Sequence, residues 1–401
     1  MIGAIVLILI LFLINQGLFK AFAQKHIWFS KKLMNILFVY HLFFFGVYYT
    51  YAQFNNSDSY GYFGRVEVSR SWFNHFGTST TFIDFLTWPF VNILGFNYEM
   101  MMLLFAWFGY IGFVYAYLFF RENIPVKIKV FNFDFLTLVL FLPNMHFWTA
   151  SLGKGAPIFM SLMMFAYAIG KPKSRWGILI ISSIITYYVR PHVFLFVGIG
   201  TVLGYMTGRE KVALWKKVTI YAGMIGALIL VQDTILGMAG LEESGNLVQG
   251  FEQFSEDRGS ELAKSGSGVD MANYPLPLKL FTFWFRPLFL DAPGFLGLIV
   301  SVENLIYLFL FFKILKKDFL KFFKKSPISV KMSLTTFFLA SLAMAFVMSN
   351  LGIIMRQKSM VMYFLFFVIY YYLAQKKYDR IMRLRRIRKM AEKDNTGLAT
   401  T

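Results

Sequence analysis

The sequence predicts an all-α membrane protein, a polytopic bundle of about eleven transmembrane helices. Hydrophobic residues make up 57% of its 401 positions and charged residues only 15%, whereas a soluble domain carries roughly 25% charged residues. The apolar residues fall into runs of about 15 to 22, and short charged loops separate these runs. Because lipid offers no partner for free backbone groups and the runs do not alternate with a period of two, the spanning elements are expected to be helices.

The first apolar run has no positive residue before it and no small-residue cleavage site after it. We therefore expect it to stay in the membrane rather than to be removed as a signal peptide. Each of the other helices is predicted from a similar apolar run. The predicted helices lie at 2–19, 33–52, 98–120, 130–150, 156–170, 176–189, 191–207, 217–235, 294–312, 329–349 and 359–374.

The distribution of charge predicts the orientation of the bundle. If the amino terminus lies outside, the loops that fall in the cytoplasm hold 30 of the 40 lysines and arginines, as expected because cytoplasmic loops are enriched in positive residues. The carboxy terminus is then cytoplasmic. We interpret 1–375 as a single transmembrane domain with outer loops at 53–97 and 236–293, followed by a basic cytoplasmic tail at 376–401.

The net charge of +19 is gathered mainly in that tail and in the segment KKDFLKFFKK at 316–325. Both are expected to lie against anionic lipid head groups. This explains the positive charge, so we expect no nucleic acid partner. The chain has no cysteine, which excludes disulfides, thiolate metal sites and cysteine nucleophiles. The inner loops are short and hold no nucleotide-binding motif, and we expect neither a metal nor a cofactor.

The first outer loop carries the segment NNSDSYGYFGRVEVSR at 55–70, in which a carboxylate stands among tyrosines and arginines. Aromatic faces beside carboxylates are typical of sugar binding. We therefore expect Asp58 to act as a catalytic base and Tyr60 and Arg65 to contact the substrate. An ordinary belt of aromatic residues at the membrane surface is the alternative explanation for the tyrosines.

The second outer loop begins with an acidic stretch rich in glycine and serine, whose composition is typical of a mobile loop. Glu256 and Asp257 in this stretch are reserve candidates for the base. The loop ends in NYPLPLKLFTFWFRPLFLDAPG at 273–294, whose prolines forbid one continuous helix. We interpret this end as a re-entrant or interfacial hairpin that carries Arg286 between aromatic residues.

Further cations mark three short outer turns, and each turn adjoins a helix shorter than the roughly 20 residues that a bilayer core requires. These cations are therefore expected below the outer surface, where charge usually faces a bundle interior or a wet cavity. Snorkelling of each side chain to the surface is the alternative. Together with Arg286, they predict an anion-binding cavity. The predicted substrate-binding cations are Lys154, Arg190, Arg286, Arg356 and Lys358.

Arginine binds phosphate through a planar fork and lysine binds it as a point charge. The lipid-linked pyrophosphate of a sugar carrier is therefore a natural ligand at the outer leaflet. The motifs DSYGY at 58–62, W-x-x-S-x-G-K at 148–154, Arg-Pro at 190–191 and FRP at 285–287, with Glu303, resemble those of the bacterial O-antigen and exopolysaccharide repeat-unit polymerases. More distantly, the chain is similar to membrane glycosyltransferases that use polyprenyl-linked sugars.

The resemblance implies a cell-envelope enzyme of polysaccharide biosynthesis in the bacterial inner (cytoplasmic) membrane. An acceptor hydroxyl would attack the anomeric carbon of a polyprenyl-pyrophosphate-linked oligosaccharide at the outer face. A carboxylate would take the proton while the cations stabilise the leaving pyrophosphate. An envelope polysaccharide-assembly complex is the implied partner.

Two other classes of function stay open. A transporter or flippase for a lipid-linked oligosaccharide or polysaccharide would need an alternating pathway, which is usually built from repeats. The sequence shows no internal repeat, and Asp134 and Glu303 are the main acids within the predicted spans. A scaffold for an envelope complex would instead use the polar clusters as contact surfaces.

Overall fold

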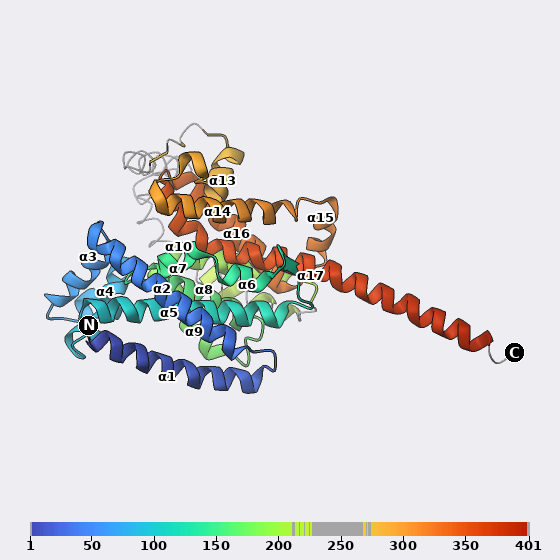
Figure 1. The fold of residues 1–401 in the computed structure, drawn as a ribbon, viewed down its shortest axis with the longest axis horizontal. Helices are drawn as coiled ribbons and strands as arrows, with labels where there is room; N and C mark the ends of the chain where they lie inside the picture. Colours follow the sequence, from blue (N-terminus) through green and yellow to red (C-terminus); the bar gives the residue numbers. More distant parts are fainter. Residues whose placement is uncertain are drawn as a thin grey trace.

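A computed structural model describes residues 2–210, residues 213–226 apart from 216, 220 and 224, and residues 268–398 apart from 270, 272 and 273. These residues are mostly helical (Figure 1). The one pair of strands among them is a short antiparallel hairpin formed by β1 (Lys129–Val130) and β2 (Phe133–Asp134), and Gly268 forms a single β-bridge with Asn350. The predicted all-α class is therefore confirmed for the described part of the chain.

Six of the described helices are long and apolar enough to cross a membrane, so this is a helical membrane protein. Four shorter apolar helices accompany them, together with the apolar helical segment Phe135–Trp148, which is divided in two as described below. The long helices are α1 (Ile2–Lys25), α2 (Lys31–Phe54), α5 (Tyr98–Asn123), α14 (Gly294–Phe312), α16 (Ile328–Val347) and α17 (Leu351–Leu398). The shorter ones are α8 (Gly155–Ile169), α9 (Trp176–Val189), α10 (Pro191–Thr207) and α13 (Leu276–Phe285).

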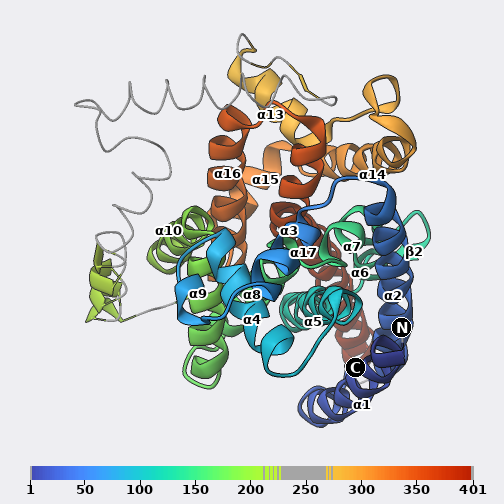
Figure 2. The ribbon, with the colours of Figure 1, turned by 90° about the vertical axis from the view of Figure 1, so that its left-hand side faces the viewer.

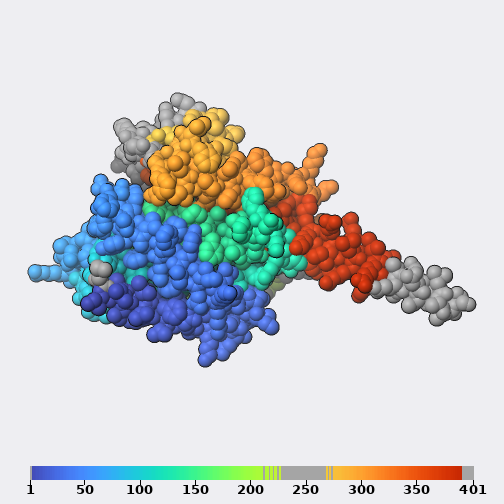
Figure 3. Space-filling model, viewed as in Figure 1, coloured from blue at the N-terminus to red at the C-terminus, as the bar shows by residue number. Residues whose placement is uncertain are grey.

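The long helices run in roughly one direction, which gives the bundle two distinct ends (Figure 1). One end, here called the α3–α4 end, holds the start of the chain with α3 (Asp58–Glu67), the short 3₁₀ helix η1 (Phe73–His75) and α4 (Thr80–Asn92). The opposite end, here called the tail end, holds α15 (Lys317–Lys324). There the last part of α17 projects away from the body of the molecule (Figure 3).

Helix α5 lies in the interior of the bundle, and α1 lies at its rim (Figure 2). Two glycines bring α5 close to its neighbours. A Cβ at Gly112 would lie 2.5 Å from Phe159 of α8, and a Cβ at Gly109 would lie 2.2 Å from the Thr149 carbonyl oxygen. By contrast, large apolar side chains along α1 are exposed, and this face is the surface that lipid tails would cover.

The predicted helix at 130–150 is divided in the structure, which corrects that prediction. Helix α6 (Phe135–Leu140) ends before α7 (Pro143–Thr149) begins. Proline has no N–H and disfavours a helical conformation of the residue before it, so Pro143 can start a helix but not continue one. The carbonyls freed at the break are satisfied by side chains. Tyr363 donates to Val139, His146 to Leu140, and Tyr40 to Phe141.

A second difference concerns the end of the chain, where we predicted a helix at 359–374 and a separate tail. The structure has a single helix, α17, which starts at Leu351. The sequence from 353 to 396 holds neither proline nor glycine, so nothing interrupts the helix. Arg356 and Lys358, which we expected in a turn, therefore lie on its first two turns. Most of the predicted helix at 217–235 lies outside the described residues.

Candidate anion-binding site

A cavity of about 880 Å³ opens at the α3–α4 end and is here called the α3 pocket. One wall is the end of α2 with the residues that follow it, at 52–57. Helix α3 supplies most of the remaining side chains, and two more come from the starts of α4 and α8. The side chains beyond 57 are those of Asp58, Tyr60, Tyr62, Arg65, Thr80 and Lys154.

Asp58 stands at the first position of α3. Ser57 caps this helix, because its hydroxyl oxygen accepts a hydrogen bond from the N–H of Ser59. A carboxylate in the first turn is favoured by the helix dipole, which explains a short helix starting here. The Asp58 side chain is 67% exposed and pairs with Arg356 at 3.0 Å, so it is accessible from the pocket and already contacts a cation.

Tyr60 forms an aromatic platform beside this carboxylate. Its ring stacks on Tyr98 of α5, with the ring centres 4.6 Å apart and the planes 8° from parallel. The Tyr98 hydroxyl is also 2.7 Å from the Ser59 hydroxyl. These contacts hold α3 against α5 and leave Tyr60 43% exposed at the pocket.

Arg65 is held in a two-pronged ion pair with Asp84 of α4. Its Nε lies 2.7 Å from one carboxylate oxygen and its Nη2 lies 3.0 Å from the other. Asp84 is buried, whereas the Arg65 side chain is 46% exposed. Pairs of this geometry are strong and directional. Arg65 therefore joins α3 to α4 and brings little unbalanced charge to the pocket.

Three other cations gather beside the pocket from separate parts of the chain. Lys154 precedes α8 and donates to the Ser79 hydroxyl at 2.6 Å. Arg190 connects α9 to α10 and donates to Gln357 at 2.5 Å. Arg356 lies on α17, with its guanidinium 5.8 Å from the centre of the Trp148 ring.

The pKa of Lys154 indicates how close these charges are. Burial, followed by the positive charges of Arg190 and Arg356, lowers this pKa to about 8. Asp58 acts in the opposite direction. Gly153, directly before Lys154, has a φ of +156°, a backbone conformation that other residues disfavour, so a glycine suits this turn.

The acids that the structure describes do not balance the positive charge of this cluster. Among the described residues, Asp58 is the one carboxylate paired with any of the three cations. Arg190 is 8% exposed, and the Nε atoms of both Arg190 and Arg356 are buried without a hydrogen-bond partner in the described chain. Burying an unpaired charge costs several kcal/mol. The cluster is therefore chemically suited to binding an anion.

Two of the predicted cations lie elsewhere. Arg286 pairs with Asp291, and Arg190 and Arg356 rank among the main charges that act on Lys154 whereas Arg286 does not. Lys358 is completely buried and donates to the Arg286 carbonyl at 2.7 Å and to Asn304 at 2.6 Å. These contacts join α13, α14 and α17. Glu303, also buried, accepts from the backbone N–H of Asn144 at 2.8 Å.

The structure thus brings together Asp58, Tyr60, Arg65, Lys154, Arg190 and Arg356, and it separates Arg286 and Lys358 from them. Glu256 and Asp257 lie outside the described residues. No group of three or more metal-ligating side chains occurs within the residues that the structure describes.

Sequence reasoning missed two residues that shape the site. Asp84 was visible as a lone acid in an otherwise apolar and aromatic stretch, and such an acid needs a partner when buried. Gln357 directly follows Arg356 but gave no signal, because its partner, Arg190, is 167 positions away in the chain.

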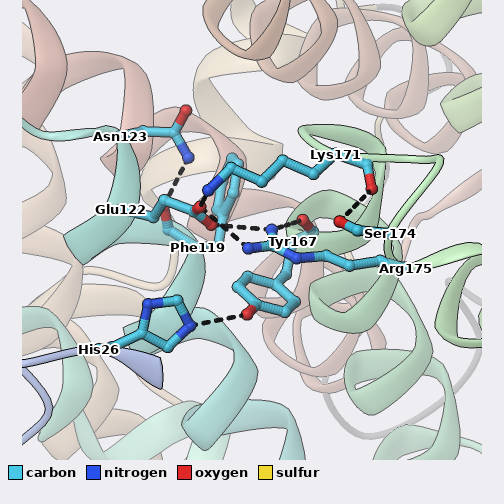
Figure 4. A network of polar contacts seen from close by, with 8 residues as sticks. All are labelled: His26, Phe119, Glu122, Asn123, Tyr167, Lys171, Ser174 and Arg175. Carbon is cyan, nitrogen blue, oxygen red and sulfur yellow. Dashed lines mark hydrogen bonds and ion pairs between the residues drawn. The ribbon is translucent and has the colours of Figure 1, made fainter. Parts of the chain in front are cut away.

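A second charged cluster, here called the tail-end network, lies where α5 ends, at the opposite end of the bundle. Its contacts are shown in Figure 4. Glu122, near the end of α5, pairs with Lys171 and with Arg175, the latter at 2.8 Å. Arg175 also lies 3.6 Å from the centre of the Tyr167 ring. His26 contacts the Tyr167 hydroxyl at 3.1 Å. The network connects the α1–α2 and α8–α9 turns to α5.

Comparison of the chain with protein-family models, with curated proteins and with solved structures gives no match in any of the three. The function therefore has to be inferred from the site itself.

Proposed function

We propose that the α3 pocket binds the pyrophosphate of a polyprenyl-linked glycan and that the protein transfers the glycan to an acceptor hydroxyl. The observation that carries this proposal is the positive charge of Lys154, Arg190 and Arg356, for which the described residues supply one paired carboxylate, Asp58. A pyrophosphate supplies the missing negative charge. Its oxygens suit both the planar fork of arginine and the point charge of lysine.

In this proposal Arg356 exchanges one anion for another. Without substrate it pairs with Asp58 at 3.0 Å. A bound pyrophosphate competes for the guanidinium and releases Asp58, which then accepts the proton of the acceptor hydroxyl. The acceptor oxygen bonds to the anomeric carbon while the bond from that carbon to the pyrophosphate oxygen breaks. The electron pair leaves with the pyrophosphate, whose charge the cations stabilise.

The aromatic platform supplies a surface for the sugar. Tyr60, stacked on Tyr98, exposes part of its ring beside Asp58. Amphipathic rings of this kind combine an apolar face with a hydroxyl. This arrangement supports a sugar rather than a simple inorganic anion as the group next to the pyrophosphate.

The proposal includes the predicted topology of eleven spans, with the α3–α4 end outside a bacterial inner membrane. The exposed lysines of α15 and the exposed arginines at 380–388 of α17 support this orientation, because positive residues favour the cytoplasmic side and anionic head groups. A reporter that fluoresces only in the cytoplasm should give signal when fused after Lys173, Lys317 or Lys377. Signal after Asn56 would place the pocket on the wrong side.

Chain growth tests the reaction itself. Membranes that contain the lipid-linked glycan should form long chains with the native protein and none with Asp58→Asn, which removes the base. Glu67→Gln, an exposed carboxylate on the same helix, is the matched control and should leave chain length unchanged. Normal long chains with Asp58→Asn at equal protein level would rule out Asp58 as the base, and Glu256 and Asp257 would be tested next.

One observation favours the alternative function, a transporter or flippase for the same lipid. The division between α6 and α7 lies beside the buried Glu303, whose carboxylate accepts from Asn144 just after the break. Discontinuous helices of this kind are found at transporter binding sites. Movement of a labelled lipid-linked glycan between leaflets, without chain growth, would favour this alternative.

A further inference from the structure

A buried histidine pair lies deep in the bundle, apart from the α3 pocket. His41 lies near the middle of α2, and His146 lies on α7. They are 1% and 0% exposed, respectively. The ring of Phe113 stacks on His146, with the ring centres 3.9 Å apart and the planes 3° from parallel. The proposed glycan transfer does not use either histidine.

The contacts of the two rings fix where their hydrogens lie. His41 Nε2 is 2.9 Å from the Ala106 carbonyl oxygen, and His146 Nε2 is 2.7 Å from the Leu140 carbonyl oxygen. A carbonyl oxygen only accepts, so each Nε2 must carry a hydrogen. The two Nδ1 atoms face each other at 2.8 Å. If both rings were neutral, two lone pairs would meet at that distance.

The other neutral arrangement is no better. One ring would carry its hydrogen on Nδ1 and turn a bare Nε2 toward a carbonyl oxygen. A buried hydrogen bond would then be lost and a lone pair would face a lone pair, which costs free energy. A third hydrogen placed between the Nδ1 atoms satisfies all three contacts together.

We propose that His41 and His146 share one proton and form a cationic proton-binding site inside the bundle. The proton comes from solvent, lies between the two Nδ1 atoms, and gives the pair a single positive charge. The stacked ring of Phe113 favours that charge through its π face. The two carbonyl dipoles act in the same direction, since each accepts from an N–H of the charged pair.

Among the described residues one acid, Glu303, lies near the pair, and its charge also acts on the buried Lys358. The hydroxyls of Tyr40, Tyr110 and Tyr363 each donate to a backbone carbonyl, of Phe141, Met34 and Val139 respectively. None of these hydroxyls is thus directed at the histidines. Glu303 of α14 lies close enough for its charge to act on Tyr40, whose ring centre is 4.8 Å from that of His146.

The shared proton would join the two elements that lead to the α3 pocket. Helix α2 runs from His41 to the pocket wall at 52–57, and the chain after α7 reaches the pocket at Lys154. Losing the proton would bring two lone pairs face to face and weaken the contact between α2 and α7. This inference does not depend on which anion the pocket binds.

Nitrogen NMR on the full chain labelled with ¹⁵N-histidine tests the proposal. The chain has five histidines, and the variants His26→Gln, His75→Gln and His192→Gln assign the signals outside the pair. At neutral pH the pair should show three nitrogens with bound hydrogen and one without, or two averaged Nδ1 signals, with a coupling between the Nδ1 atoms. Two bare nitrogens, one in each ring, would overturn the proposal.

The variant His146→Gln provides a second readout. Glutamine keeps a polar group beside His41 but cannot share the proton as a second imidazole does. His41 should then show one bare nitrogen, as a neutral ring does. A His41 ring that stays doubly protonated in this variant would show that the charge belongs to His41 alone, which also contradicts a shared site. The spectrum of the native chain decides the question even if this variant does not fold.

Discussion

The two ends of the bundle hold charged clusters that are built in opposite ways. In the tail-end network, Glu122 contacts both Lys171 and Arg175, and Arg175 also lies over the Tyr167 ring (Figure 4). Beside the α3 pocket, three cations share one carboxylate, and two guanidinium Nε atoms lack a partner within the described chain. In the tail-end network the buried Arg175 has a carboxylate partner, which stabilises the fold. The buried Arg190 has none among the described residues, so this end gains from a ligand that supplies negative charge.

The largest expected effect of this difference is on ligand binding. We expect Arg190→Gln to weaken binding of a short-chain polyprenyl-pyrophosphoryl sugar about ten- to a hundred-fold, since a hydrogen bond to a charged group contributes about 1.5–3 kcal/mol. Arg190→Lys should restore little, because an ammonium cannot reproduce the planar fork. Equilibrium binding to the purified protein in detergent measures both variants.

The matched control for that measurement is Arg209→Gln, which removes an exposed arginine at the tail end. It should leave the affinity within the error of the native value. An equal loss in the Arg190 and Arg209 variants would mean that the probe responds to total charge rather than to the α3 pocket.

The next effect concerns the free energy of unfolding. Removing a charge should lower it in the tail-end network but should not lower it beside the α3 pocket. Glu122→Gln leaves the buried Arg175 without its carboxylate and should lower stability by about 1.5–3 kcal/mol. Arg190→Gln instead removes a buried charge that lacks a carboxylate partner among the described residues, so the ligand-free protein should be no less stable. Thermal unfolding in detergent compares them. A clear destabilisation by Arg190→Gln would show that the free protein already balances this charge.

The sequence was sufficient for the fold class because lipid imposes one requirement, long apolar helices, on every span. Six such helices confirm the all-α membrane bundle. The break at Pro143 was also visible, since the cost of proline within a helix is local. We nevertheless predicted one helix there, because the apolar run continues through the break and its polar partners, Tyr40 and Tyr363, lie far away in the chain.

The candidate site could be predicted only in part. Lys154, Arg190 and Arg356 lie near the same end of neighbouring helices, so the alternation of spans alone places them at similar depth. We predicted Arg286 at the same site, but it pairs with Asp291, an acid only five positions along the chain. The contact between the two histidines could not be predicted, because they are 105 positions apart and nothing in the sequence indicates that α2 and α7 place them side by side.

The smallest expected effect is the pH dependence of binding, and it follows from Lys154. Its pKa is lowered to about 8 by burial and by Arg190 and Arg356, compared with about 10.4 for an ordinary lysine. In the ligand-free protein the unfolded chain therefore binds more protons between these values, so stability should rise with pH across that window.

Binding of an anion should show the opposite trend, because it favours charged Lys154. Affinity should be constant below about pH 8 and fall above it as the free protein loses this charge. A pyrophosphate diester, such as a polyprenyl-pyrophosphoryl sugar, has no group that titrates in this range, so the fall belongs to the protein. Lys154→Gln should bind the anion more weakly at every pH, and its affinity should not fall above pH 8. In Lys154→Arg the side chain stays charged, so the affinity should not fall above pH 8 there either. If the slope persists in Lys154→Gln, another group titrates and Lys154 does not contact the anion.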